Sequence, residues 1–127
     1  SFDNQSVLAD PNDFYHRYLA TLRIRGVRPE EIDNFIKQNR GEIDPALQYQ
    51  LQRTLGLSDP KFDARLSRLP SDYAAFVKED FYTQLSKFRI DYILSKGELK
   101  ESVIESLPNL EKVASFRDMV IYQFKNN

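Results

Sequence analysis

The spacing of apolar residues predicts a chain built largely from short helices. Phe14, Tyr15, Tyr18, Leu19 and Leu22 recur at steps of three and four residues. This is the spacing of one face of an α-helix. We therefore expect a first helix from about residue 11 to residue 25. Two arginines in its last turn complement the negative end of the helix dipole.

Four more apolar stripes of the same period predict four further helices. We expect a short helix ending near Asn39 (Ile32, Phe35, Ile36), a third helix (Leu47, Leu51, Leu55), a short fourth helix (Phe62, Leu66, Leu69) and a long helix over about 71–88 (Tyr73, Phe76, Val77, Phe81, Leu85, Phe88). A stripe this long predicts that the last helix packs along a sheet.

Proline and glycine mark the expected ends of these helices. An aspartate caps a helix and a proline suits its first turn, so each Asp-Pro pair indicates a start. Glycine favours the left-handed residue that follows a helix. The predicted starts are the pairs at 10–11, 44–45 and 59–60, Pro29 with its two glutamates, and the stretch 70–72; the predicted ends are Gly26, Gly41 and Gly56.

The last third of the chain has the pattern of strands. Residues 90–94 form a short apolar run, and the runs 112–116 and 119–124 flank Arg117-Asp118 as the arms of a hairpin. Residues 6–9 are a candidate first strand, and residues 99–107 form either a weak helix or a loop. We therefore predict an α/β (α+β) fold in one domain, residues 1–127. A small mixed sheet with a C-terminal hairpin packs against a block of about five helices.

Composition narrows the possible functions. The 127 residues carry 18 basic and 19 acidic side chains, a formal charge of −1, so no electrostatic argument favours nucleic acid as a partner. The chain has no cysteine and one histidine, which excludes thiol chemistry and multi-histidine metal sites. No run of 18 apolar residues is present, so the sequence predicts no membrane-spanning helix.

The sequence offers no recognisable catalytic group. His16 is the one side chain that ordinarily titrates near neutrality, and no orienting partner for it is evident. The adjacent acids at 30–31 and 79–80 diverge on a helix and do not form an acid–base pair. No Gly-rich phosphate loop and no nucleophile elbow occurs. We therefore predict no catalytic residue, no metal site and no cofactor in this chain.

One argument from position gives a candidate ligand site. In open α/β sheets, ligands bind beyond the carboxyl ends of parallel strands. If residues 6–9 and 90–94 are parallel neighbours, their ends bring Asp10, Asn12, Ser95 and Lys96 to one edge of the sheet. Helix capping and turn formation account for the same four residues without a ligand.

Two segments of the chain resemble a known family. The first contains Arg17-Tyr18-Leu19-Ala20, Gly26-Val27 and Pro29-Glu30-Glu31-Ile32; the second contains Phe88-Arg89-Ile90-Asp91-Tyr92-Ile93-Leu94, Leu107-Pro108-Asn109-Leu110-Glu111-Lys112-Val113 and Val120-Ile121-Tyr122-Gln123-Phe124. In kind and order these segments resemble the C-terminal soluble domain of bacterial polytopic membrane proteins related to the C-type glycosyltransferases.

The resemblance implies an accessory role without catalysis. The family transfers sugars from polyprenyl-phosphate donors with acidic residues in loops beside membrane helices, and no residue here matches those loops. The resemblance therefore implies an extracytoplasmic domain, excised from a larger membrane protein, that recognises the parent membrane domain, a glycan or a lipid-linked sugar. Two alternatives remain open: a free-standing cytoplasmic protein-interaction domain, and a small hydrolase or transferase that uses the edge between Asp10 and Lys96.

Overall fold

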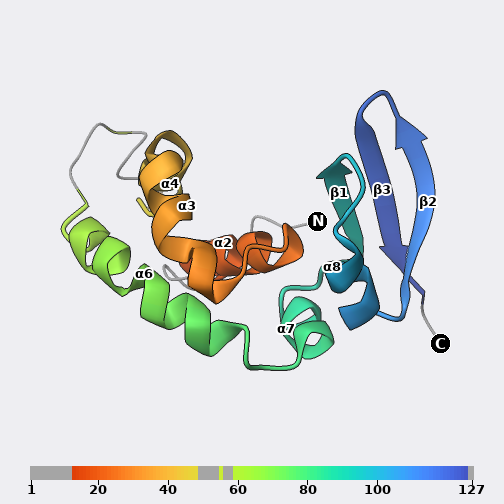
Figure 1. Ribbon diagram of the computed structural model, residues 1–127, viewed down its shortest axis with the longest axis horizontal. Coiled ribbons are helices and arrows are strands. Elements are labelled where there is room, and N and C mark those ends of the chain that lie inside the picture. Colours follow the sequence, from red (N-terminus) through yellow and green to blue (C-terminus); the bar gives the residue numbers. More distant parts are fainter. Residues whose placement is uncertain (1–12, 49–54, 56–58, 126–127) are drawn as a thin grey trace.

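Helix α2 (Asp13–Ile24) lies between two groups of elements in the computed structural model, which describes residues 13–48, 55 and 59–125 (Figure 1). The first group is helical: η1 (Pro29–Glu31), α3 (Ile32–Gln38), α4 (Arg40–Ala46) and α6 (Phe62–Phe76). The second group carries the sheet: α7 (Phe81–Lys87), β1 (Tyr92–Lys96), α8 (Glu101–Ser106), β2 (Leu110–Phe116) and β3 (Met119–Phe124). The predicted class, helices packed with a small sheet, is confirmed.

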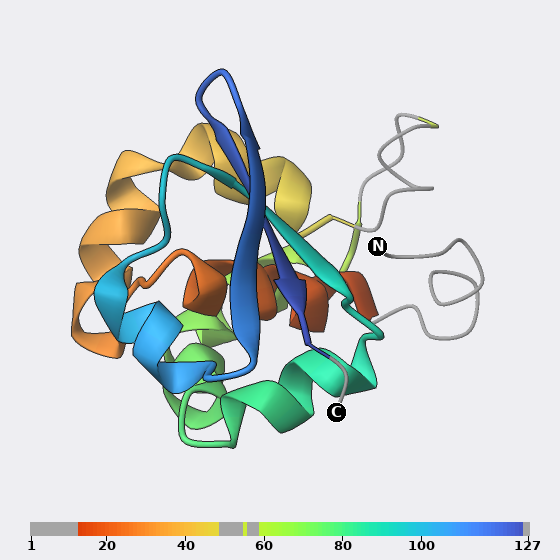
Figure 2. The same ribbon diagram turned by 90° about the vertical axis from the view of Figure 1, so that its right-hand side faces the viewer.

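The sheet has the strand order β1-β3-β2 in the described part of the chain, and both pairings are antiparallel (Figure 2). The predicted C-terminal hairpin is confirmed, with Phe116 opposite Met119 and a shift of register between Lys112 and Ala114. Arg117 in the turn has a φ of 57°, the left-handed region that hairpin turns require. The parallel pairing that would make the sheet mixed involves residues 6–9, which lie outside the described residues.

Two hydrophobic cores share α2. The helix-side core joins Leu19 and Leu22 to fully buried side chains from α4 and α6 and to the residue that follows α4, among them Ile43, Leu47, Leu69 and Tyr73. The sheet-side core joins Ala20 to one face of the sheet and to α7 and α8; its members include Phe81, Leu85, Ile93, Val103, Val120 and Tyr122. Helix α2 therefore lies between the two cores and contributes side chains to both.

The predicted long helix over 71–88 is wrong, because the chain folds there into two helices. Helix α6 starts earlier and continues through Pro70, although proline removes one hydrogen bond of the helix. Leu69 and Tyr73, which flank Pro70, are completely buried, and their burial outweighs that loss. The chain then breaks at 77–80. Helix α7 begins after Asp80, whose carboxylate accepts a hydrogen bond from the backbone N–H of Thr83 at 2.9 Å.

The predicted start at Asp44-Pro45 and the predicted end at Gly41 are also wrong. All three residues lie inside α4, which ends just before Leu47. Leu55, expected on the stripe of a third helix, is 63% exposed. The predicted end at Gly26 is confirmed by its φ of 76°. Asp59-Pro60 precedes α6 as expected, whereas the pair at 10–11 and Gly56 lie outside the described residues.

Two features of the sheet half differ from or refine the prediction. The strand expected over 90–94 runs from Tyr92 to Lys96, two residues later. The stretch 99–107 contains a helix, α8, rather than a loop. Leu99, Val103 and Leu107 from this stretch are buried in the sheet-side core, and their spacing of four residues is the reason for the helix.

Replacing Phe81 by Ala should lower the free energy of unfolding by about 3–5 kcal/mol, because the ring is buried in the sheet-side core. Urea unfolding followed by circular dichroism measures this change. Tyr82→Ala is the matched control, since the Tyr82 ring is 41% exposed and makes one edge contact with Phe124. Tyr82→Ala should lower the free energy of unfolding by less than half as much as Phe81→Ala. Equal losses would contradict the assignment of Phe81 to the sheet-side core.

Candidate functional site

Two of the four predicted site residues, Ser95 and Lys96, lie at the end of β1. Ser95 is half-buried and Lys96 is exposed. Asp10 and Asn12 lie outside the described residues, so the edge that was expected to unite all four is not tested. The structure instead brings Ser95 and Lys96 opposite the C-terminal half of α2.

A cleft of about 500 Å³ separates β1 from α2, and we call it the sheet cleft. One wall is β1, with Tyr92, Leu94, Ser95 and Lys96; the other consists of Thr21, Ile24 and Arg25, with Ile90, Ile93 and Leu99 completing the lining. Most of these side chains are apolar. Its two charged lining residues, Arg25 and Lys96, are both basic. As far as its described lining shows, the sheet cleft is an apolar groove that also carries two basic side chains.

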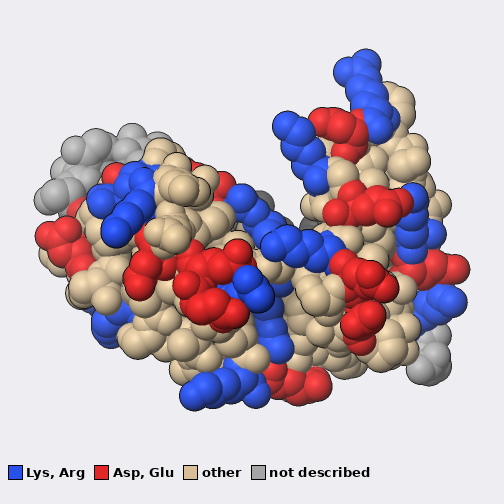
Figure 3. Space-filling view, viewed as in Figure 1, with Lys and Arg blue, Asp and Glu red and all other residues tan. Residues whose placement is uncertain are grey.

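The space-filling view shows the molecule hollowed between the helical group and the sheet, with basic side chains at the floor of the hollow (Figure 3). A smaller cleft of about 430 Å³ shares Arg25 with the sheet cleft and adds Lys100, Glu31 and Phe35. Lys100 is held there because its Nζ donates to the carbonyl of Gly26 at 3.0 Å. Arg25 forms an ion pair with Glu42 at 2.8 Å, and both side chains are about 40% exposed.

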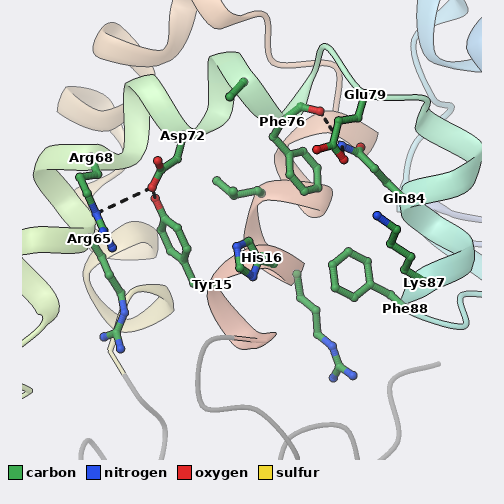
Figure 4. A pocket seen from close by; sticks show the side chains of 13 residues that line it. Tyr15, His16, Arg65, Arg68, Asp72, Phe76, Glu79, Gln84, Lys87 and Phe88 are labelled. Atoms are coloured by element: carbon green, nitrogen blue, oxygen red, sulfur yellow. Dashed lines mark hydrogen bonds and ion pairs between the residues drawn. The ribbon is translucent and has the colours of Figure 1, made fainter.

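A second large cleft, of about 740 Å³, lies between α2, α6 and α7, and we call it the helix cleft (Figure 4). The Tyr15 hydroxyl donates to Asp72 at 2.7 Å, and Arg68 approaches the same carboxylate at 3.9 Å. Burial, together with the hydrogen bond to Asp72, raises the pKa of Tyr15 above its usual value. Lys87 and Phe88 lie across the cleft from His16. On this side of the helix cleft, Tyr15 and Arg68 thus already interact with Asp72.

Arg23 ties the two halves of the molecule together. Its guanidinium donates to the carbonyl of Glu79 at 2.8 Å and to the side-chain oxygen of Gln84 at 2.5 Å. It also stacks over the Phe81 ring, 4.2 Å from the centroid. The side chain of Gln84 returns a hydrogen bond to the carbonyl of Phe76. One arginine of α2 therefore fixes the break between α6 and α7.

Among the residues described, no three metal-ligating side chains gather into a group. His16 is exposed, and its ring contact is with Tyr15, at 5.8 Å between centroids. Over the same residues, no helix combines the length and the apolar character needed to cross a bilayer.

The sequence analysis missed Arg23 and Arg25 as residues that organise the site. Both were assigned to the negative end of the helix dipole, with no contact to another element, yet both side chains reach other elements. One signal was available for Arg23. It stands four residues after Leu19 and so falls on the buried face of the helix, where a charged group requires a partner. No comparable signal marks Arg25.

Comparison of the chain with protein-family models, with curated proteins and with solved structures gives no match.

Replacing Arg23 by Met should destabilise the fold by about 2–3 kcal/mol, because the apolar stem is kept but the carbonyl of Glu79 and the amide of Gln84 lose a charged donor. Chemical denaturation measures the change. Arg25→Met is the matched control, two residues further along the chain, just after the end of α2. Its ion pair is solvent-exposed, so its cost should stay within about 1 kcal/mol. Similar costs for the two variants would show that Arg23 does not hold the halves together.

Proposed function

We propose that this chain is a non-catalytic accessory domain that recognises an anionic group in the sheet cleft. Its context, in this proposal, is a glycosyltransferase-like integral membrane protein, and its place is the extracytoplasmic face of a bacterial membrane. The ligand is a lipid-linked sugar phosphate, or a partner chain such as the parent membrane domain. The family context rests on the sequence resemblance alone.

One observation supports the binding role: among the residues that the structure describes, two charged side chains line the sheet cleft, and both are basic. The chain as a whole has a formal charge of −1, so the local excess of positive charge is not a property of the entire surface. Lys96 is exposed, and no acidic side chain pairs with it among the described residues. A free ammonium beside an apolar groove suits a ligand that combines an anion with an apolar part.

A second candidate function, a free-standing cytoplasmic protein-interaction domain, is favoured by a different observation. The outer face of the sheet carries Leu94 and Phe116, which are 66% and 69% exposed. Large apolar side chains on an open sheet face are typical of surfaces that meet another protein. The genomic context discriminates between the two functions. A reading frame that continues upstream into hydrophobic segments supports the membrane-associated domain, and a start codon near Ser1 contradicts it.

Amide NMR shifts should locate the ligand site. A water-soluble isoprenyl phosphate, inorganic phosphate and a neutral disaccharide are titrated separately into the ¹⁵N-labelled chain. We expect the isoprenyl phosphate to shift the amides of Ser95, Lys96 and Arg25, with a dissociation constant near the millimolar end, about 1 mM, since the contacts of the phosphate with exposed basic side chains compete with water.

Lys96→Ala should weaken this binding, and Lys87→Ala in the helix cleft is its matched control. Both lysines are exposed, and neither forms an ion pair within the described residues. Shifts confined to the helix cleft, or equal effects of the two variants, would remove the sheet cleft as the recognition site. An isoprenyl phosphate that binds no better than inorganic phosphate would remove the role of the apolar lining.

A further inference from the structure

We propose that β1 accepts an extended acidic peptide segment as a fourth strand of the sheet, with the segment lying in the sheet cleft between β1 and α2. The inference rests on the proposed function, since it names the partner of the same cleft. It places the partner's backbone on the free edge of β1 and the partner's carboxylates beside Lys96 and Arg25.

The free edge of β1 follows from the register of its pairing with β3. A backbone hydrogen bond lies at each end of that pairing. The N–H of Phe124 donates to the backbone carbonyl of Asp91 at 3.1 Å, and the N–H of Gly97 donates to the backbone carbonyl of Asp118 at 2.7 Å. In an antiparallel ladder, alternate residues bond to the same neighbour. The backbone N–H and C=O groups of residues 91, 93, 95 and 97 therefore point toward β3. Those of Tyr92, Leu94 and Lys96 point away from it.

No strand covers this edge in the part of the chain that the structure describes, because β1 is the outer strand of the order β1-β3-β2. Three N–H groups and three carbonyls thus form a regular row along the sheet cleft. Addition of an extended segment to such a row is an established mode of peptide recognition, in which the main-chain hydrogen bonds supply much of the affinity.

The residues on the edge do not prevent such pairing. Proteins protect an exposed edge with proline, with a bulge or with inward-pointing charges. The register shift of this sheet lies in β2, and β1 contains no proline. Lys96 stands at the last position of the strand, whereas Tyr92 and Leu94 present apolar side chains on the outer face. The edge therefore remains able to pair over most of its length.

Helix α2 supplies the second wall and determines the chemistry of the partner. Ile24 and Thr21 face the groove with apolar or small side chains. Arg25, the next residue along the chain, adds a guanidinium that pairs with Glu42 through Nη1 and has further N–H donors. On the strand side, Ile93 points into the sheet-side core and Lys96 lies on the outer face. An added strand has alternating side chains, so one set lies beside Leu94 and Lys96 and the other faces α2. Carboxylates of the first set therefore lie near Lys96, and carboxylates of the second set lie near Arg25.

Three synthetic heptapeptides test the proposal on the full chain. The first alternates Val and Glu and has blocked ends. The second has Lys in place of Glu, and the third repeats the first with methylated backbone nitrogens. We expect the first to shift the amides of β1 and the C-terminal half of α2. The second and third should bind at least about tenfold more weakly, because each loses either the charge pairing or the backbone donors.

Leu94→Pro removes one free-edge N–H and leaves the pairing with β3 in place, since edge strands tolerate proline at such positions. It should weaken the acidic peptide by about tenfold. Ser115→Pro is the matched control on β2, where the same alternation directs the N–H outward, and it should leave binding unchanged. Lys96→Glu is a second variant that keeps the test valid if Leu94→Pro does not fold. With Lys96→Glu, the chain should bind the basic peptide more tightly than the acidic one.

The outcomes separate this inference from the proposed function. If the peptides bind nowhere and isoprenyl phosphate still shifts Lys96, the peptide partner is wrong and the anion site stands. If the N-methylated peptide binds as well as the first, addition to the edge is wrong. Self-association that Leu94→Pro abolishes, or binding of a peptide of residues 4–10 in preference to the acidic one, would assign the edge to a second copy or to this chain itself. Either result overturns the proposal.

Discussion

The guanidinium of Arg23 is the contact on which the arrangement of the two halves depends. It leaves α2 at the boundary between the cores and donates to the carbonyls of Phe76 and Glu79, where α6 ends, and to the side chain of Gln84 in α7. The carbonyls at a helix end lack partners within the helix, and a charged donor satisfies them more strongly than a neutral one. Burial lowers the pKa of Arg23, yet its usual value is so high that the group stays charged. The direction taken by α7, and with it the position of the sheet, follows from this contact.

Both clefts exist because α2 is shared. Its two sides are covered by different cores, and it contributes Tyr15 and His16 to the helix cleft and Thr21 and Ile24 to the sheet cleft. Because both sides of α2 are covered, little of its surface is exposed to solvent. The clefts therefore lie where neighbouring elements diverge from α2, and each has α2 as a wall or floor. Gly26 ends the helix beneath Lys100, where an added Cβ would come within 2.6 Å of the lysine stem.

Sequence alone predicted the class of fold and the terminal hairpin, because apolar periodicity and a two-residue turn are local signals. It failed at Pro45 and Pro70, where local rules favour a helix start and burial of Ile43, Leu47, Leu69 and Tyr73 decides otherwise. Of the residues that line the sheet cleft, Ser95 and Lys96 were expected from the sequence to lie in a ligand site, but Arg25 was not. Their meeting depends on the angle between α2 and β1, a tertiary quantity that no spacing along the chain encodes.

The two cores divide the sequence almost cleanly. The helix-side core draws on residues 14–77, and the sheet-side core draws on residues 76–124 with Ala20 and Ile24 from α2. Proteins open locally in contiguous cooperative units, and here each unit coincides with a nearly unbroken stretch of chain. Partial unfolding of the second unit separates β1 from α2 and dissolves the sheet cleft while the helical core persists. A partner bound in the sheet cleft would stabilise the second unit against such opening, and would therefore slow hydrogen exchange selectively in the C-terminal half.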